Sequence, residues 1–170
     1  MKRVGLIAIC ILLLGSLCGC GEQTLGLYIL PADSISEGMT AGEIAEIAGE
    51  QGRLALSGSD FAGVDWENQC YAVKSEASAS VSVISPESGG SSILKTTDSD
   101  VFVWVLNGKV LYVGGFEKGS ASVLPQQDPY IKDKERYIFS IETLEQQSDK
   151  RFNSKLYNYF YKQGLLKSEL

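Results

Sequence analysis

Residues 101–113 read VFVWVLNGKVLYV, in which two runs rich in β-branched and aromatic residues flank the dipeptide Asn107-Gly108. Asn-Gly between two such runs is the strongest short signal for a β-hairpin, because both central positions of a type I′ turn require positive φ angles. We therefore predict a hairpin with strands at 101–106 and 109–113. The chain should contain antiparallel β-structure around it.

A second β signal precedes the hairpin. Residues 77–83 read ASASVSV, so that small apolar side chains alternate with serines. A period of two predicts a strand with one apolar and one hydroxyl-rich face, and residues 71–74 are expected to lead into it or into its neighbour. A Ser-rich, low-complexity linker is the alternative. Residues 25–30, LGLYIL, fit either an edge strand or an apolar arm packed on the domain.

A short helix is predicted at residues 41–51. Thr40 and Glu43 match the S/T-x-x-E capping box, in which each side chain accepts a hydrogen bond from the other's backbone amide. The apolar residues that follow recur at helical spacing, and Gly49 or Gly52 is a plausible end.

The C-terminal part of the chain is predicted to be helical over about 138–164. Its apolar residues fall at near-helical spacing: Ile141, Leu144, Phe152, Leu156, Tyr159 and Phe160. Two interpretations of its tyrosines remain open. The helix lies across a sheet with amphipathic Tyr side chains at its borders, or it exposes an aromatic surface to a partner. The candidate partner-binding residues are Trp104, Tyr112, Tyr157 and Tyr161.

These elements predict a single α+β domain over residues 25–170. In it, a short N-terminal helical segment packs on an antiparallel sheet of about three to five strands, and a C-terminal helix follows.

The N-terminus has the features of an export signal. Lys2 and Arg3 are followed by an apolar run at residues 4–14 and by a small-residue stretch up to Gly19. An apolar run of this length is too short to span a bilayer, which requires about 20 residues. We predict a signal peptide at residues 1–19.

The four residues Leu17-Cys18-Gly19-Cys20 resemble the lipobox of bacterial lipoproteins. The resemblance implies that Cys20 receives a diacylglyceryl group and that cleavage occurs between Gly19 and Cys20. Cys18 departs from the Ala or Ser more often found at its position. An ordinary cleaved signal, or an uncleaved helix with incidental cysteines, is the alternative.

Residues 20–24 then form a very short lipid-anchored tether. The lipoprotein resemblance implies that the domain sits on the extracytoplasmic face, either on the outer face of the cytoplasmic membrane or on an outer membrane. Its acyl chains would hold it on the membrane, since two chains anchor stably where one does so only marginally.

The net charge limits the kinds of partner that the protein is expected to bind. The part after residue 19 carries 13 basic and 21 acidic side chains, a formal charge of −8. This charge argues against nucleic acid as a partner and against electrostatic adhesion to an anionic bilayer. We expect lipid on Cys20, rather than charge, to attach the protein to the membrane.

The sequence contains few of the residues and motifs that carry catalysis. The chain has no His, which excludes Cys–His and Ser–His nucleophile pairs, and Cys70 is the only cysteine after Cys20. We expect Cys70 to be a small buried hydrophobe on a strand. No nucleotide-binding or metalloprotease motif is present, and we predict no cofactor and no metal site. A pair of catalytic carboxylates stays open, with these candidates: Asp60, Asp65, Glu67, Asp98 and Asp100.

A second resemblance covers residues 35–115. Ile35-Ser36-Glu37-Gly38-Met39-Thr40, followed by Glu43-Ile44, is similar to the opening of β-lactamase inhibitory protein-like domains and of small lipoproteins of the outer-membrane assembly machinery. The resemblance implies a helical pair before an antiparallel sheet. It implies no transferable activity, because a fold does not fix a function.

The sequence therefore predicts a lipid-anchored extracytoplasmic protein-interaction module of the cell envelope, without catalytic activity. The partners expected are the membrane, through lipid on Cys20, and another envelope or extracellular protein. The alternative is a lipid-anchored, carboxylate-based hydrolase or small-ligand-binding protein. A structural spacer is a third possibility, and it predicts a surface without an exposed aromatic patch.

Overall fold

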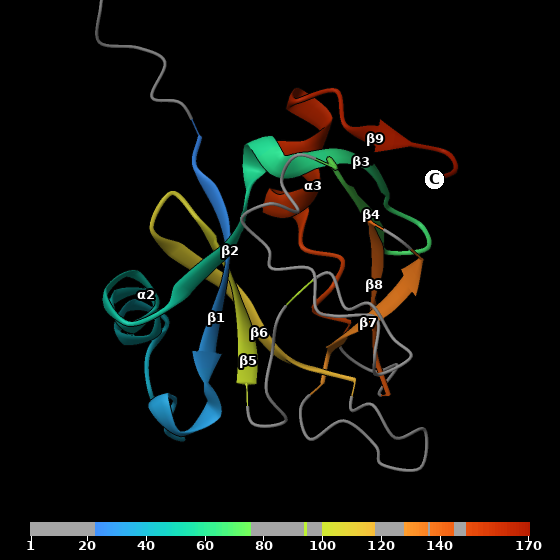
Figure 1. The fold of residues 1–170 in the computed structure, drawn as a ribbon. Coiled ribbons are helices and arrows are strands. Elements are labelled where there is room, and N and C mark those ends of the chain that lie inside the picture. Colours follow the sequence, from blue (N-terminus) through green and yellow to red (C-terminus); the bar gives the residue numbers. More distant parts are fainter. Residues whose placement is uncertain (1–22, 76–93, 95–99, 118–127, 136, 145–148) are drawn as a thin grey trace, which may run out of the picture.

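The computed structural model describes residues 23–75, 94, 100–117, 128–135, 137–144 and 149–170 (Figure 1). The predicted signal peptide, Cys20, most of the tether and the predicted strand at 77–83 lie outside the described residues. Within them, no helix has the length and apolarity needed to cross a bilayer.

The described residues form nine strands, two α-helices and two 3-10 helices. The strands are β1 (Leu25–Pro31), β2 (Arg53–Ser57), β3 (Phe61–Asp65), β4 (Cys70–Val73), β5 (Asp100–Leu106), β6 (Lys109–Phe116), β7 (Tyr130–Glu135), β8 (Ile138–Glu142) and β9 (Leu166–Lys167). The helices are η1 (Ala32–Ser34), α2 (Ala41–Glu50), η2 (Gly58–Asp60) and α3 (Ser154–Lys162).

All nine strands join one mixed sheet in the order β2-β1-β5-β6-β7-β8-β4-β3-β9. The pairs β6–β7 and β3–β9 are parallel, and the other pairs are antiparallel. The prediction of an antiparallel sheet of three to five strands is therefore wrong. Its main causes are that β2 and β3 do not alternate between buried and exposed residues and that β8 was included in the predicted C-terminal helix.

The helical pair that the resemblance over residues 35–115 implies does not occur in the described part of that range, where α2 is the one α-helix. β1 itself is not an edge strand, because it pairs with β2 on one side and with β5 on the other.

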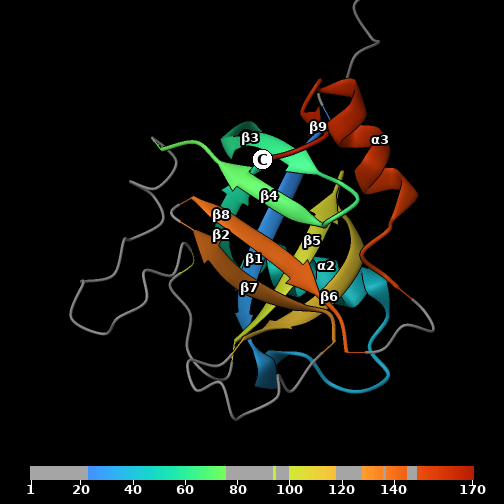
Figure 2. The ribbon, with the colours of Figure 1, turned by 90° about the vertical axis from the view of Figure 1, so that its right-hand side faces the viewer.

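The sheet folds so that its two halves face each other across one core. Trp104 of β5 lies 5.7 Å from Phe61 of β3 and 5.9 Å from Tyr71 of β4, measured between ring centroids. Figure 2 shows the second half, β7, β8 and β4, in front of β1 and β5. α3 closes one end of this core with Leu156 and Phe160, which are fully buried.

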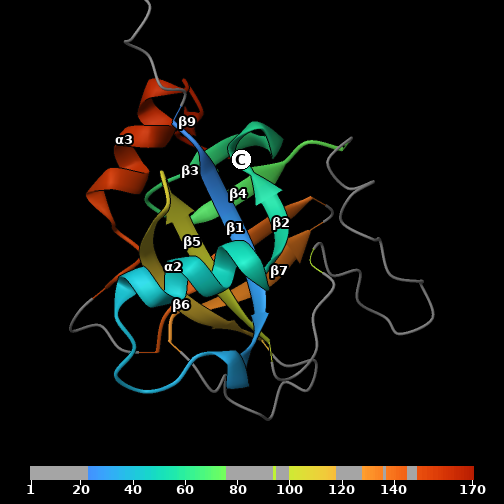
Figure 3. The ribbon, with the colours of Figure 1, turned by 90° about the vertical axis from the view of Figure 1, so that its left-hand side faces the viewer.

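α2 covers the outer face of the first half of the sheet, where it crosses β1 and β5 (Figure 3). The alternate residues of β5 therefore enter two different cores. Val101, Val103 and Val105 pack toward α2, whereas Phe102 and Trp104 pack toward the second half of the sheet. Burial on both faces explains why β5 is apolar at every position after its first, as in strands covered on both sides.

The predicted hairpin is confirmed. Asn107 and Gly108 have φ angles of 52° and 71°, as a type I′ turn requires, and they connect β5 to β6. The turn is also tied to the start of β1. The Thr24 amide donates to Asn107 Oδ1 at 2.9 Å, and the Asn107 amide donates to the Thr24 carbonyl at 2.8 Å.

The predicted helix after Thr40 is confirmed as α2, and so is its capping box. The Thr40 amide donates to the Glu43 carboxylate at 2.7 Å, and the Glu43 amide donates to Thr40 Oγ1 at 3.3 Å. These hydrogen bonds lower the pKa of Glu43. The helix ends at Glu50, so Gly52 rather than Gly49 follows its end.

We expect Gly49→Ala to raise the free energy of unfolding by about 0.5–1 kcal/mol, because alanine is the better helix former. A Cβ at Gly49 would meet no atom within 4 Å. Urea unfolding followed by circular dichroism measures the change. Gly52→Ala is the matched control and should destabilise, since its Cβ would lie 2.4 Å from the Ala48 carbonyl oxygen. Equal effects of the two substitutions would contradict this packing.

The predicted C-terminal helix over about 138–164 is wrong in its first half. Residues 138–142 form β8, which pairs with β7 and β4 and buries Phe139 and Ile141. Apolar residues two positions apart at the start of the segment fit a strand as well as a helix, and pairing on both edges favours the strand.

The second half of that prediction is confirmed as the shorter helix α3. The Asn153 side chain caps its start by accepting from the Lys155 and Leu156 amides. Its end is a Schellman motif, in which the Gly164 amide donates to the Tyr161 carbonyl and the Leu165 amide to the Phe160 carbonyl.

Candidate interaction surface

The four predicted partner-binding residues separate into two groups. Trp104 and Tyr112 are buried, with exposed fractions of 0% and 5%, whereas Tyr157 and Tyr161 are exposed, with 38% and 67%. The assignment of Trp104 and Tyr112 to a partner surface is therefore corrected. Both lie in the core between the two halves of the sheet, where their rings fill space that no partner reaches.

Tyr157 and Tyr161 stand four residues apart on α3 and so share one of its faces. Their rings are nearly parallel, with 12° between the planes and 6.2 Å between the centroids. Leu156 and Phe160, about 100° away around the helix, are buried and hold it on the core. The two tyrosines are thus presented on a fixed helix.

Two further aromatic residues extend this surface. Trp66, in the turn between β3 and β4, lies 5.4 Å from Tyr157 and 6.0 Å from Phe152, both in edge-to-face geometry. Phe152 is 46% exposed. We call these four residues, Trp66, Phe152, Tyr157 and Tyr161, the α3 aromatic cluster.

Sequence reasoning did not assign Trp66 or Phe152 to a site. Phe152 was counted among the apolar residues of a longer helix, although it precedes α3. Trp66 stands in the polar stretch Asp65-Trp66-Glu67-Asn68, and a tryptophan in a polar turn is the signal that would have singled it out.

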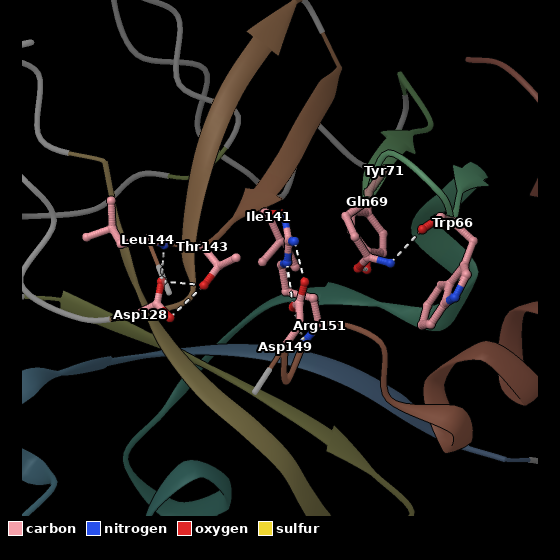
Figure 4. A network of polar contacts seen from close by, with 9 residues as sticks. All are labelled: Trp66, Gln69, Tyr71, Asp128, Ile141, Thr143, Leu144, Asp149 and Arg151. Atoms are coloured by element: carbon pink, nitrogen blue, oxygen red, sulfur yellow. Dashed lines mark hydrogen bonds and ion pairs between the residues drawn. The ribbon is translucent and has the colours of Figure 1, made fainter. Parts of the chain in front are cut away.

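Hydrogen bonds fix the turn that carries Trp66. The Asp65 carboxylate accepts from the Asn68 amide at 3.1 Å and from Asn68 Nδ2 at 2.7 Å. Gln69 is fully buried with a positive φ of 51°, and its Nε2 donates to the Trp66 carbonyl at 2.7 Å (Figure 4). Tyr71 donates from its hydroxyl to Gln69 Oε1 at 2.9 Å. These hydrogen bonds therefore fix the backbone that carries the Trp66 indole.

Arg151 fixes Phe152 from the other side. Its Nε donates to Asp149 Oδ1 at 2.7 Å and its Nη1 to the Ile141 carbonyl at 2.9 Å, so that it joins the end of β8 to the segment before α3 (Figure 4). Hydrogen bonding to Arg151 lowers the pKa of Asp149. The guanidinium carbon also lies 5.6 Å from the centre of the Phe152 ring, within cation–π range.

A third polar contact holds the two strands that precede this segment. The Asp128 carboxylate accepts from the Thr143 hydroxyl at 2.7 Å and from the Leu144 amide at 2.7 Å (Figure 4). It joins the start of β7 to the end of β8. Its carboxylate serves the backbone rather than an open pocket.

Two of the carboxylates predicted as an alternative catalytic pair, Asp60 and Asp65, hold local structure. Asp60 accepts from the Ser57 amide at 2.6 Å and caps η2, and Asp65 holds the Trp66 turn. A shallow groove of about 270 Å³ holds Asp65 beside Cys70 and Lys134, with no second Asp or Glu side chain in its lining. Asp98 lies outside the described residues.

Cys70 lies on β4, as predicted, but it is only half-buried. Burial and the nearby Asp65 carboxylate raise the pKa of its thiol, which disfavours the nucleophilic thiolate. Among the described residues, no three His, Cys, Asp or Glu side chains come together in a group that could hold a metal ion.

The buried tyrosines beneath the cluster predict alkaline sensitivity. Burial raises the pKa of Tyr71 and of Tyr112 well above the ordinary value near 10. The unfolded chain releases these protons first, so the contribution of the two tyrosines to the free energy of unfolding should be constant below about pH 10 and fall above it, by up to about 1.4 kcal/mol per pH unit for each tyrosine. Urea unfolding at a series of alkaline pH values measures the slope.

Tyr112→Phe should reduce that slope, because it removes one of the buried phenols whose pKa is raised. The free energy of unfolding of this variant near neutral pH is the reference from which its alkaline decrease is measured. A free energy of unfolding that stayed constant to the most alkaline pH tested would contradict the buried, neutral state of both hydroxyls.

No family model, no curated protein and no solved structure matches this chain.

Proposed function

We propose that the protein is a lipid-anchored, extracytoplasmic protein-interaction module of the cell envelope, and that the α3 aromatic cluster is its surface for a partner protein. Two independent features support the proposal. The lipobox-like sequence that ends at Cys20 supports the anchor and the location. The exposed aromatic cluster supports the interaction, and it is the observation on which the proposal mainly rests.

The cluster has the properties of a protein-binding surface. Aromatic residues are enriched at interfaces, and Trp and Tyr dominate their binding energies because each buries a large area with few rotatable bonds. Here four rings form a continuous row, three of them more than a third exposed. Hydrogen bonds at Gln69 and Arg151 hold the row in place, so little ordering remains for binding to require. A spacer without such a patch fits these observations less well.

The hydrolase alternative has weaker support. The groove beside α2 and the start of β1 has a volume of about 470 Å³, within the range of small-molecule sites. Its lining contains no carboxylate and consists of apolar, small and hydroxyl-bearing residues, with one amide, Gln23. Carboxylate-based hydrolysis of a glycoside uses a pair of carboxylates that flank the bond that breaks. This groove offers none.

Site-specific photocrosslinking in native membranes tests the proposal. A photoreactive phenylalanine analogue at position 161 should give a protein adduct of one defined mass. The same analogue at position 54 is the matched control, because Leu54 is also more than half exposed, at 51% against 67% for Tyr161, but lies on β2, away from the cluster. Combining the probe at 161 with Tyr157→Ala should reduce the adduct by about tenfold, as loss of a binding hot spot does.

Three outcomes would count against the proposal. The absence of any adduct at 161 is the first, and an identical adduct at 54 is the second. An adduct at 161 that Tyr157→Ala leaves unchanged is the third, because it would separate the contact from the cluster.

A further inference from the structure

A groove lined by lysines lies on the other flank of α3, opposite the aromatic cluster. It has a volume of about 320 Å³ and lies between the β5–β6 turn and α3. Its lining contains three lysines and no carboxylate: Gln23, Leu106, Asn107, Lys109, Leu111, Lys155, Asn158, Tyr159 and Lys162. We call this feature the basic groove. Lys155 and Lys162 stand seven residues, about two helical turns, apart and so share one face of α3.

The lysines of the basic groove differ from other cations of the described chain. Lys132 and Lys134 form ion pairs with Glu117 and Glu142, and Arg151 pairs with Asp149. Within the described residues, no carboxylate pairs with the three lysines of the groove. Three positive charges converge there without a counterion from the described chain.

Basic residues are also concentrated in the C-terminal segment of the chain, which includes α3. Residues 149–170 carry five basic and two acidic side chains, whereas residues 20–148 carry eight basic and 19 acidic. The strongly negative total therefore conceals one positive end. Salt screens carboxylates that lie more than about 8–10 Å away, so the potential beside the groove depends mainly on its own lysines and on charges close to them.

The chain also places this end near the proposed anchor. Gln23, which lines the basic groove, follows Cys20 by three residues. Three residues span at most about 10 Å. β1 starts at the end of the molecule where α3 lies (Figures 1 and 3). Lipid on Cys20 would hold the groove within about one Debye length of the headgroups.

We propose that the basic groove binds the phosphate headgroups of an anionic lipid surface and so orients the domain on the bilayer. The inference rests on lipidation of Cys20, which belongs to the proposed function. Each lysine near an anionic surface contributes about fivefold to binding, which for three lysines gives about a hundredfold preference for the oriented state. Tyr157 and Tyr161 lie on the other flank of α3, so the aromatic cluster faces along the membrane, toward another membrane-bound protein.

Lysine labelling of the full-length protein tests the orientation. The lipidated chain is purified from membranes, the mass of its N-terminal peptide is measured, and the protein is placed in vesicles of phosphatidylcholine alone or mixed with phosphatidylglycerol. A soluble amine-reactive reagent then modifies the lysines, and mass spectrometry gives each rate. Lys109, Lys155 and Lys162 should react about tenfold more slowly in the anionic vesicles, and raised salt should restore their rates.

Lys74 and Lys134 serve as internal controls, since neither lines the groove. A charge-matched pair of variants adds a second measurement. In the unsubstituted protein we expect the backbone amides of residues 107–109 to exchange more slowly with solvent in anionic vesicles than in vesicles of phosphatidylcholine alone. Substitution of all three groove lysines by glutamine should abolish that difference. Substitution of Lys74, Lys132 and Lys134 by glutamine should leave that difference unchanged.

Each other outcome overturns the inference in a recognisable way. A lipidated Cys20 with equal labelling in both kinds of vesicle would overturn the basic groove alone. Slow labelling in both kinds would mean that the tether brings the groove to the surface without charge recognition. An N-terminal peptide without lipid mass would overturn the anchor and, with it, the orientation.

Discussion

Cys20→Ser is expected to remove the protein from the lipidated membrane fraction. The hydroxyl cannot take the place of the thiol that carries the diacylglyceryl group in the lipoprotein resemblance. Each buried methylene of an acyl chain contributes about 0.8 kcal/mol, a factor of about four in partitioning, so loss of the chains lowers membrane affinity by many orders of magnitude. Cell fractionation, with the mass of the N-terminal peptide, measures the effect.

Cys18→Ser is the matched control for this substitution. It changes a cysteine two residues away and places there a residue more common in lipoboxes, so membrane attachment and lipid mass should be retained. An ordinary secretory signal predicts that Cys20→Ser is processed and released as the wild type is. An uncleaved anchor predicts that both variants stay on the membrane with the signal attached. The lipid mass on residue 20 separates these three cases.

Local signals were the part of the fold that the sequence predicted well. The Asn107-Gly108 turn and the Thr40–Glu43 capping box depend on residues that are neighbours in the chain, so their geometry follows from their own chemistry. The sheet depends on pairings such as Tyr71 with Phe139, which are far apart in sequence. Nothing in a five-residue strand states which strand lies beside it, and the extent of the sheet was therefore underestimated.

The candidate site was predicted in part for the same reason. Tyr157 and Tyr161 lie outside the apolar face of α3, which a helical pattern can indicate. The sequence of β5 gives no such indication. Both faces of the strand are apolar, so its pattern does not show whether Trp104 is exposed or buried. Trp66 joins the cluster only because the β3–β4 turn lies beside α3 in space.

Net charge is a second quantity whose local value depends on the fold. A total of −8 after residue 19 argued against contact with an anionic bilayer, but it averages over the whole surface. A membrane surface interacts mainly with the protein charges that lie within about one Debye length of it. Lys109 is separated from Lys155 by 46 positions in the sequence, and only the fold brings the two to one groove.

Trp104→Ala is expected to lower the free energy of unfolding by about 3–5 kcal/mol, the cost of removing a large aromatic side chain from a closed core. Trp104 is 0% exposed, and its ring contacts Phe61 and Tyr71 of the second half of the sheet and Phe160 of α3. Its loss removes contacts between three parts of the fold at once. Urea unfolding followed by circular dichroism measures the change.

Two matched substitutions separate packing from the other consequences of losing an indole. Trp66→Ala removes the same side chain from a half-buried position and should cost less than Trp104→Ala, because part of that ring already faces water.

Trp104→Phe should cost only about 1 kcal/mol. It leaves a smaller cavity, and it removes an indole N–H that is buried and has no hydrogen-bond partner within the described part of the chain. If Trp104→Phe were as damaging as Trp104→Ala, the indole N–H would have a partner that this core does not provide. If Trp66→Ala were the more damaging of the two alanine variants, the turn beside α3, rather than the ring between the two halves of the sheet, would hold the fold together.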